Sequence, residues 1–288
     1  MFRLCFCASL LVFILAFAAT AQEIPFKIEK GYLLISGTVK GDLPFEAAVS
    51  TGSPYSYYNE ASLKKLRLTE SSSNDIPGTV FTKDNAMTLV YAPITIADQK
   101  QAEMRMLTRR EAFDAISRAL GRKIDFILGA DYFDGRIVQL DFRSHVVRFL
   151  KEAPFEYKSG TFASQDGGVR FVARMTGNTQ SVFGNMVTLP VADEVTLNGN
   201  KAPSLINTGV IMPVIAKPNL AKGAEKTSSG APTINVALGT YQMNTVPVRL
   251  DDVKDQYDKS YNAILGLGLL QNFTITLDWK DKWIVLEK

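Results

Sequence analysis

Two short stretches, Val49-Ser50-Thr51-Gly52 and Ile206-Asn207-Thr208-Gly209, decide the fold that this sequence predicts. Each consists of an apolar residue, a small polar residue and a Thr-Gly pair, and each ends a run in which apolar and polar residues alternate. Such alternation is typical of a β-strand with one buried face, and glycine permits a sharp turn after it. Each stretch therefore predicts a strand that ends in a turn.

A second pair of matched segments makes these stretches part of an internal repeat. Ile127-Leu128-Gly129 is followed by Leu140-Asp141, and Ile264-Leu265-Gly266 is followed by Leu277-Asp278 at the same spacing. Both halves of the chain thus carry a strand, a Thr-Gly turn, a long insert, an Ile-Leu-Gly segment and a further strand. We expect two halves of similar fold, with a boundary near residues 155–168.

Strands are expected to dominate both halves. Alternation between residues 33 and 49 predicts a hairpin with its turn at Lys40-Gly41-Asp42. Residues 187–206 repeat this design around an Asn198-Gly199 turn, a dipeptide that favours positive φ.

One clear helix is predicted between the two hairpins. Thr108 and Glu111 fit a capping box, an apolar face follows, and Gly121 is a suitable helix end. A shorter helix is expected after Asn59. Residues 69–79 and 221–232 have the composition of loops.

The N-terminus is typical of an export signal, which we expect to span residues 1–21. Arg3 precedes an apolar run over residues 10–17, and Ala19-Thr20-Ala21 fits a cleavage site. The apolar run is shorter than the roughly 20 residues that a membrane span needs. We therefore expect cleavage and no stable span afterwards, with an uncleaved membrane anchor as the alternative.

Composition limits the classes of function. Of the 288 residues, 46% are hydrophobic and 21% are charged, which is ordinary for a globular protein. The net charge is +3 and no basic stripe favours nucleic acid as a partner, while Arg109-Arg110 is interpreted as a solvated helix face. Cys5 and Cys7 both lie in the export signal, so the mature chain has no cysteine chemistry. The expected compartment is the periplasm, or the outside of the cell.

The order of the two Thr-Gly stretches and the two Ile-Leu-Gly segments resembles the two lobes of an aspartic protease of the retropepsin and pepsin kind. The resemblance covers nearly all of residues 24–288. It implies a mostly β fold of two pseudo-symmetric β-barrel lobes with a few short helices, divided into residues 22–158 and residues 159–288. Because both lobes are present in one chain, a monomer is the simplest expectation.

In that family the Asp-Thr-Gly loops of the two lobes meet at the floor of a cleft, so Thr51 and Thr208 would tie the loops together. The family's two aspartates share a proton and act on water and on the scissile amide. Here the corresponding positions are Ser50 and Asn207, and neither side chain titrates near the aspartate pKa of about 3.9. The resemblance thus implies an aspartic-protease-like protein that has lost catalysis.

We expect the cleft floor to bind an extended peptide, or another ligand, by strand-like hydrogen bonds. Its residues would be Ser50, Thr51, Gly52, Asn207, Thr208 and Gly209. Two alternatives remain open. One is a hydrolase that uses other residues, and the other is a structural or interaction protein whose cleft is filled by its own side chains.

The remaining candidate residues give weaker evidence of a function. The resemblance places Asp125, Asp131 and Asp141 away from the cleft floor. Ser62 to Lys65 matches the Ser-x-x-Lys pattern of penicillin-recognising enzymes, but the companion motifs are missing from the sequence. His145 is the single histidine, so a Ser-His triad or a multi-histidine metal site lacks its parts. We expect no metal and no cofactor.

Overall fold

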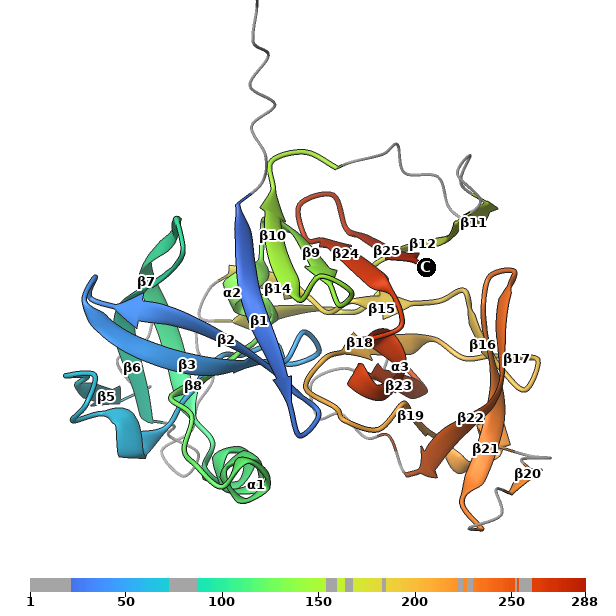
Figure 1. The fold of residues 1–288 in the computed structure, drawn as a ribbon, viewed down its shortest axis with the longest axis horizontal. Helices are drawn as coiled ribbons and strands as arrows, with labels where there is room; N and C mark the ends of the chain where they lie inside the picture. The colour runs from blue at the N-terminus through green and yellow to red at the C-terminus, as the bar shows by residue number, and fades with distance from the viewer. Residues whose placement is uncertain are drawn as a thin grey trace, which may run out of the picture.

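The structure is a computed structural model, and the arrangement of its elements is drawn in Figure 1. It describes residues 22–72, 88–153, 160–163, 168–182, 185–221, 225–226, 230–251, 253 and 261–288. The predicted export signal and most of the predicted boundary at residues 155–168 lie outside these ranges. The fold is mostly β, with 52% strand and 12% helix, as the sequence predicts.

Six strands of the first half close into a barrel. In order around it they are β2 (Tyr32–Val39), β3 (Leu43–Val49), β8 (Phe126–Leu128), β4 (Tyr57–Tyr58), β7 (Gln99–Thr108) and β6 (Thr88–Ile96), and β6 pairs again with β2. β2 and β3 are the predicted hairpin, and its turn at Lys40 and Gly41 takes positive φ. Residues at alternate positions point into the barrel, where the rings of Phe45 and Phe126 meet edge to face at 4.9 Å.

The second half repeats this pairing scheme. Its strands are β16 (Val195–Leu197), β17 (Asn200–Lys201), β18 (Ser204–Asn207), β23 (Ala263–Gly266), β19 (Val214–Ala216), β22 (Tyr241–Leu250) and β21 (Pro232–Leu238). β18 pairs in parallel with β23 as β3 pairs with β8, and β23 pairs with β19 as β8 pairs with β4. The register is equivalent as well, since Val49 faces Leu128 and Ile206 faces Leu265. The internal repeat of the sequence is thus a repeat of strand pairing.

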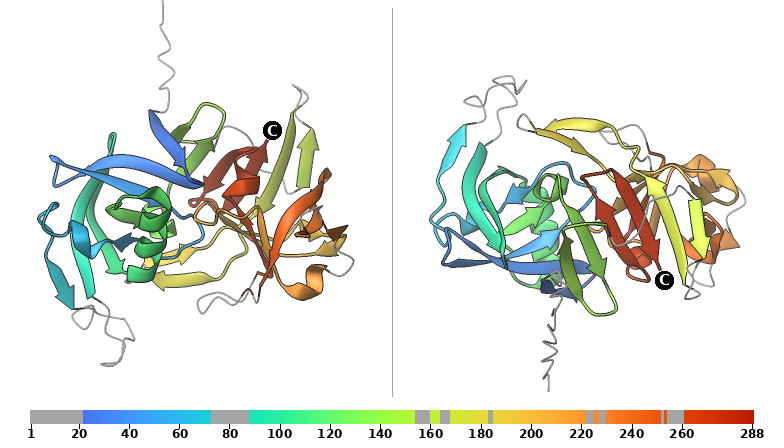
Figure 2. Two further views of the ribbon diagram at one scale, coloured as in Figure 1. Left: turned by 60° about the horizontal axis from the view of Figure 1, so that its bottom comes forward. Right: turned by 90° about the horizontal axis from the view of Figure 1, so that it is seen from above.

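A shared sheet joins the two halves, as Figure 2 shows from above. Its strands are β11 (Gly160–Ala163), β12 (Val169–Arg174), β25 (Trp283–Glu287), β24 (Thr274–Asp278), β9 (Ile137–Asp141), β10 (Val146–Leu150) and β1 (Glu23–Glu29). At its centre β9 pairs with β24 in a two-fold symmetric register, with Ile137 opposite Asp278 and Asp141 opposite Thr274. The two matched Leu-Asp segments of the sequence are therefore direct neighbours.

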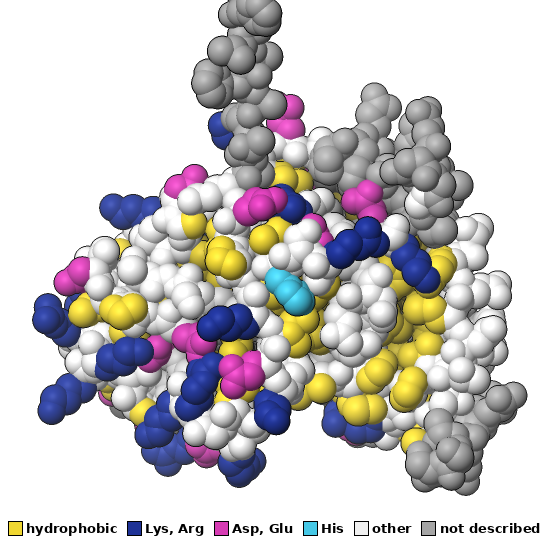
Figure 3. All heavy atoms as spheres, in the orientation of Figure 1, with side chains coloured by type: hydrophobic (Ala, Val, Ile, Leu, Met, Phe, Trp, Pro, Cys, Tyr) yellow, Lys and Arg dark blue, Asp and Glu magenta, His cyan; other side chains and the backbone are white. Residues whose placement is uncertain are grey.

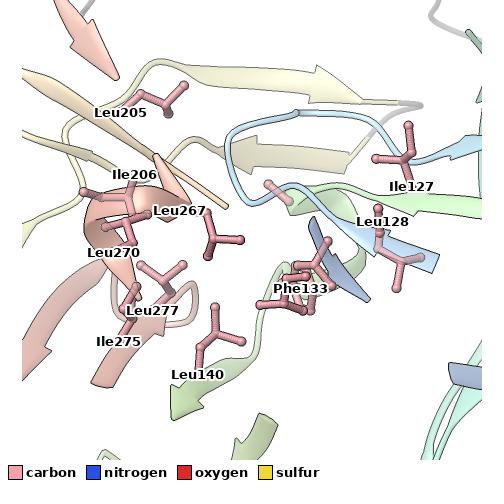
Figure 4. Packing of buried hydrophobic residues seen from close by; sticks show 14 of the residues in the cluster. Ile127, Leu128, Phe133, Leu140, Leu205, Ile206, Leu267, Leu270, Ile275 and Leu277 are labelled. Atoms are coloured by element: carbon pink, nitrogen blue, oxygen red, sulfur yellow. The ribbon is translucent and has the colours of Figure 1, made fainter. Parts of the chain in front are cut away.

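The hydrophobic core is continuous across this junction. Phe133 and Leu140 of the first half belong to the same buried cluster as Leu267 and Leu277 of the second, and Figure 4 shows them close together. Burial of this kind is the main stabilising term of a folded protein. The remaining strands are β5 (Glu70–Ser72), β13 (Thr179–Val182), β14 (Asn185–Thr188), β15 (Val191–Ala192) and β20 (Glu225–Lys226).

The described residues include three α-helices, α1 (Arg110–Leu120), α2 (Ala130–Phe133) and α3 (Leu267–Leu270). α1 is the predicted helix and ends, as expected, at Gly121 with a left-handed φ of 69°. The predicted capping box is wrong, because α1 starts after Arg109 without a side-chain cap. Thr108 instead remains in β7, where it pairs with Tyr58 of β4.

Two further predictions need correction. The helix expected after Asn59 is only a single 3-10 turn, Glu60–Ser62, although the Asn59 side chain does accept a hydrogen bond from the Ala61 amide at 3.1 Å. The loop predicted for residues 69–79 is wrong at β5, because its backbone pairs with β6, and residues 73–79 lie outside the described ranges. A second 3-10 turn spans Pro218–Ala221, and β20 lies within the other predicted loop.

Across the described ranges, the structure contains no helix with the length and apolarity that crossing a bilayer requires.

Candidate ligand-binding site at the paired Thr-Gly turns

The two Thr-Gly turns meet where the two halves come together. β3 ends at Val49 and β18 ends at Asn207, so each strand delivers its turn to the same place. The Ser50 hydroxyl donates to the Asn207 Oδ1 at 3.2 Å, and both residues are half-buried. The sequence pairs these two positions, and the structure brings them into direct contact.

Thr51 and Thr208 hold the turns together with a two-fold symmetric set of hydrogen bonds. The Thr51 hydroxyl donates to the Ile206 carbonyl at 2.8 Å, and the Thr208 hydroxyl donates to the Val49 carbonyl at 2.8 Å. The Thr208 amide donates to Thr51 Oγ1 at 3.1 Å, and the Thr51 amide donates to Thr208 Oγ1 at 3.3 Å. Both threonines are buried, so these bonds are shielded from water.

Gly52 and Gly209 let the two backbones approach the site. A Cβ atom at Gly52 would lie only 2.6 Å from Asn207 Cγ, and one at Gly209 would overlap the Ser50 hydroxyl. The amides of Gly52 and Gly209 donate to Asn207 Oδ1 at 3.4 and 2.8 Å. The contact between the two turns therefore requires glycine, which has no Cβ atom, at both positions.

These bonds define what the site can do chemically. Asn207 Oδ1 accepts from Ser50, Gly52 and Gly209, which uses its acceptor capacity fully. Among the described residues, the Asn207 side-chain NH2 has no hydrogen-bond acceptor, so it is available to a ligand carbonyl. Neither Ser50 nor Asn207 takes up a proton near neutral pH. The site therefore offers hydrogen bonds and no acid-base pair.

A pocket of about 220 Å³ opens beside Ser50, between α1 and the barrel. Its wall is mainly apolar and includes Gly209 from the second half. The lining residues are Tyr32, Ala48, Val49, Ser50, Ser53, Tyr57, Arg109, Ala112, Ala115, Ile116, Ile127 and Gly209. Arg109 is the charged residue in this wall.

The doublet Arg109-Arg110 divides into two different roles. Arg110 pairs with Glu60 at 3.3 Å on the exposed side of α1, as expected for a solvated helix face. Arg109 instead lines the pocket, and its Nη1 donates to the Tyr57 hydroxyl at 3.4 Å. Arg109 is exposed as well, so the solvated interpretation holds for both residues, and Arg109 additionally borders the pocket. The two arginines differ in position, because Arg110 is the first residue of α1 and Arg109 precedes the helix. The predicted capping box placed the start of the helix too early.

Asp125 is a structural carboxylate. It is buried, and it accepts hydrogen bonds from the Ser62 hydroxyl at 2.6 Å and from the Glu46 amide at 2.9 Å. The Lys65 ammonium pairs with it at 2.8 Å. Ser62 and Lys65, which match the Ser-x-x-Lys pattern, thus stabilise the Asp125 carboxylate. Ser62 does so by a hydrogen bond and Lys65 by an ion pair.

Asp131 has an environment that its local sequence does not reveal. Its carboxylate accepts from the Ser56 hydroxyl at 2.6 Å, from the Ser56 amide at 2.9 Å and from the Tyr132 amide at 2.9 Å. Burial raises the pKa of Asp131 to about 7, although the bonds from Ser56 and Tyr132 act in the opposite direction. Ser56 also accepts from the Gly129 amide at 2.8 Å, so Asp131 fastens the turn of the first half to the Ile-Leu-Gly segment.

Asp141 and His145 lie at the two sides of the turn that joins β9 to β10. Asp141 ends β9 and pairs with Arg148 at 3.1 Å. Burial raises the pKa of Asp141, but hydrogen bonds from Ser144 and Arg148 outweigh it and leave the pKa below its ordinary value. His145 is exposed and lies edge-on against the Phe26 ring.

Fold and site together define a mostly β protein with two equivalently paired halves and a non-ionising Ser-Asn contact between their turns. No protein-family model matches the chain, and a search of the curated proteins found no match.

Proposed function

We propose that this protein is an exported, two-lobed relative of the retropepsin and pepsin kind of aspartic protease that binds an extended peptide without cleaving it. The lobes would be residues 22–158 and residues 159–288. The observation that carries the proposal is the 3.2 Å contact between the Ser50 hydroxyl and Asn207 Oδ1, held by the threonine bonds beneath it. The two turns are in contact, as the resemblance implies for a cleft floor, and the two positions carry Ser and Asn in place of the proton-sharing carboxylates.

Loss of catalysis follows from the chemistry of the pair. An amide oxygen that already accepts three hydrogen bonds has no basic lone pair for water, and a serine hydroxyl without a base is a weak nucleophile. Positioned acid-base groups typically contribute about 10² to 10⁴-fold in rate. Hydrolysis at this site is therefore expected to be negligible.

The pocket beside Ser50 supports ligand binding. Its volume of about 220 Å³ lies below the roughly 300 Å³ at which sites for drug-sized ligands begin, so it fits one large side chain. Gly209 takes part in its wall, which places the pocket against both halves. This open space argues against the alternative in which the cleft is filled by the protein's own side chains.

The hydrolase alternative has less support. By its pKa of about 7, Asp131 is the carboxyl best suited to proton transfer. However, three hydrogen bonds from Ser56 and Tyr132 occupy its oxygens, and Ser56 itself is bonded to Gly129. These hydrogen bonds hold parts of the fold together, and the residues that make them do not line the pocket beside Ser50.

A peptide library tests the proposal. The purified protein is incubated with degenerate heptapeptides from about pH 3 to pH 8, and retained and released peptides are analysed by mass spectrometry. We expect a subset of peptides to be retained with unchanged mass. New cleavage products would favour the hydrolase alternative, and the absence of any retained peptide would contradict a binding function.

A further inference from the structure

We propose that Arg109 makes this site selective for peptides that carry a carboxylate next to the apolar side chain held in the pocket. The inference rests on the proposed function, since it names the class of peptide that the same site would take. The carboxylate is either the free end of the peptide chain or the side chain of an adjacent Asp or Glu. Both sources present the same anion to the guanidinium.

The pocket wall is mainly apolar and carries one cation, Arg109. Ala48, Val49, Ile116 and Ile127 give the pocket an apolar surface, which favours burial of an aliphatic or aromatic side chain. No acidic residue is among those that line it. A ligand that fills the pocket therefore lies beside an uncompensated positive charge.

Arg109 differs from its neighbour Arg110 in ion pairing. Within the described residues, no carboxylate lies at ion-pair distance from Arg109, whereas its neighbour Arg110 is paired with Glu60 at 3.3 Å. Figure 3 shows Lys and Arg side chains, with Asp and Glu side chains among them, on the part of this face where α1 lies. The Arg109 guanidinium is therefore the group at the pocket that can pair with an incoming anion.

The Arg109 guanidinium has a defined position against Tyr57. It lies over the Tyr57 ring, 5.5 Å from the centroid, and it donates one hydrogen bond to the Tyr57 hydroxyl. Tyr57 is buried, so its ring and hydroxyl form a fixed support. This arrangement orients the guanidinium beside the pocket and leaves further N–H donors for a bidentate carboxylate.

Three peptide libraries test the inference. One carries a free C-terminal Leu or Phe, the second has the same sequences with an amidated C-terminus, and the third is amidated but has Glu after the Leu or Phe. Retention on the immobilised protein is measured by mass spectrometry at low salt and again at 0.5 M NaCl.

We expect the protein to prefer at least one of the two carboxylate libraries over the neutral library by about fivefold or more, and we expect salt to reduce this preference. Which of the two is retained identifies the source of the carboxylate. Arg109→Gln should bring the ratio close to one while neutral peptides are still retained. The matched variant Arg110→Gln should keep the ratio of the unchanged protein.

Other outcomes separate the two proposals. Equal retention of all three libraries, or a preference that Arg109→Gln leaves intact, would overturn the role of Arg109 and leave peptide binding standing. If no library is retained, both proposals fail together. A thermal unfolding midpoint for Arg109→Gln close to that of Arg110→Gln would exclude misfolding as the cause of any difference.

Discussion

Thr51 and Thr208 accept hydrogen bonds from each other's backbone amides, at 3.1 and 3.3 Å, although 157 positions separate them in the chain. Each hydroxyl then donates to a carbonyl just before the other turn. Neither residue contributes an ionisable group. Their arrangement nevertheless fixes the distance between Ser50 and Asn207, on which the proposed site depends.

Removal of one threonine hydroxyl should destabilise the fold strongly. Thr51→Val leaves the Ile206 carbonyl and the Thr208 amide without their partner inside the protein, and we expect a loss of about 2–4 kcal/mol in the free energy of unfolding. Thr208→Val should cause a similar loss in the free energy of unfolding. Urea unfolding measures both, and Thr51→Ser, which keeps the hydroxyl, should cost less.

The two threonines should also be coupled. Because they share one hydrogen-bond network, the double variant should lose less stability than the two single losses added together. Strictly additive losses would indicate that the two turns do not support each other in solution.

Asp131 should give the protein a distinctive dependence of stability on pH. Its pKa rises from an ordinary 3.8 to about 7 in the folded protein, so between these values the folded state keeps a proton that the unfolded state releases. The free energy of unfolding should therefore decrease as the pH rises from about 4 to about 7. Urea titrations across this range should show the slope, and Asp131→Asn should reduce it.

Asp141 provides the control for this experiment. Its pKa is lowered, so its stabilising contribution is present above its ordinary pKa of 3.8 and is lost as the pH falls below that value. Asp141→Asn should therefore leave the slope between pH 4 and pH 7 unchanged. An unaltered slope in Asp131→Asn would show that other groups cause it.

Filling the pocket should weaken ligand binding without unfolding the protein. Ala112 lies on the pocket wall, and Ala112→Phe would occupy much of the 220 Å³ beside Ser50. We expect peptide retention to fall by about tenfold, the equivalent of roughly 1.4 kcal/mol. Ala119→Phe, at an exposed position in the last turn of α1, should retain peptides normally. Equal retention by both variants would place the ligand elsewhere.

Local sequence patterns predicted the strands and turns well. The alternation around Leu33 and Phe45 reports a half-buried strand directly, and Gly121 marks the end of α1 because its left-handed φ suits glycine. The repeat predicted which segments correspond between the halves. The contact of Ser50 with Asn207 was implied by the resemblance to the two-lobed aspartic proteases, in which the two matched turns meet.

Long-range partners could not be predicted in the same way. The bond between Ser56 and Asp131 joins residues 75 positions apart and leaves no periodic signal in either segment. Thr108 has the right neighbours for a helix cap, but pairing with Tyr58 keeps it in a strand, so tertiary contacts override the local preference. The pocket role of Arg109 likewise depends on Tyr57, a partner that the sequence around α1 does not reveal.

A pair of engineered carboxylates gives the most direct test of the claim that residues 50 and 207 face each other. In the Ser50→Asp/Asn207→Asp variant, the two aspartates would stand where the 3.2 Å contact is now, and two carboxylates so close cannot both ionise freely. The two single variants supply the reference titrations. Carbon-13 NMR of the aspartate carboxyl groups should show a coupled pair, with one apparent pKa below about 3.9 and the other well above it. Two independent titrations, both near 3.9, would contradict the convergence of the two turns.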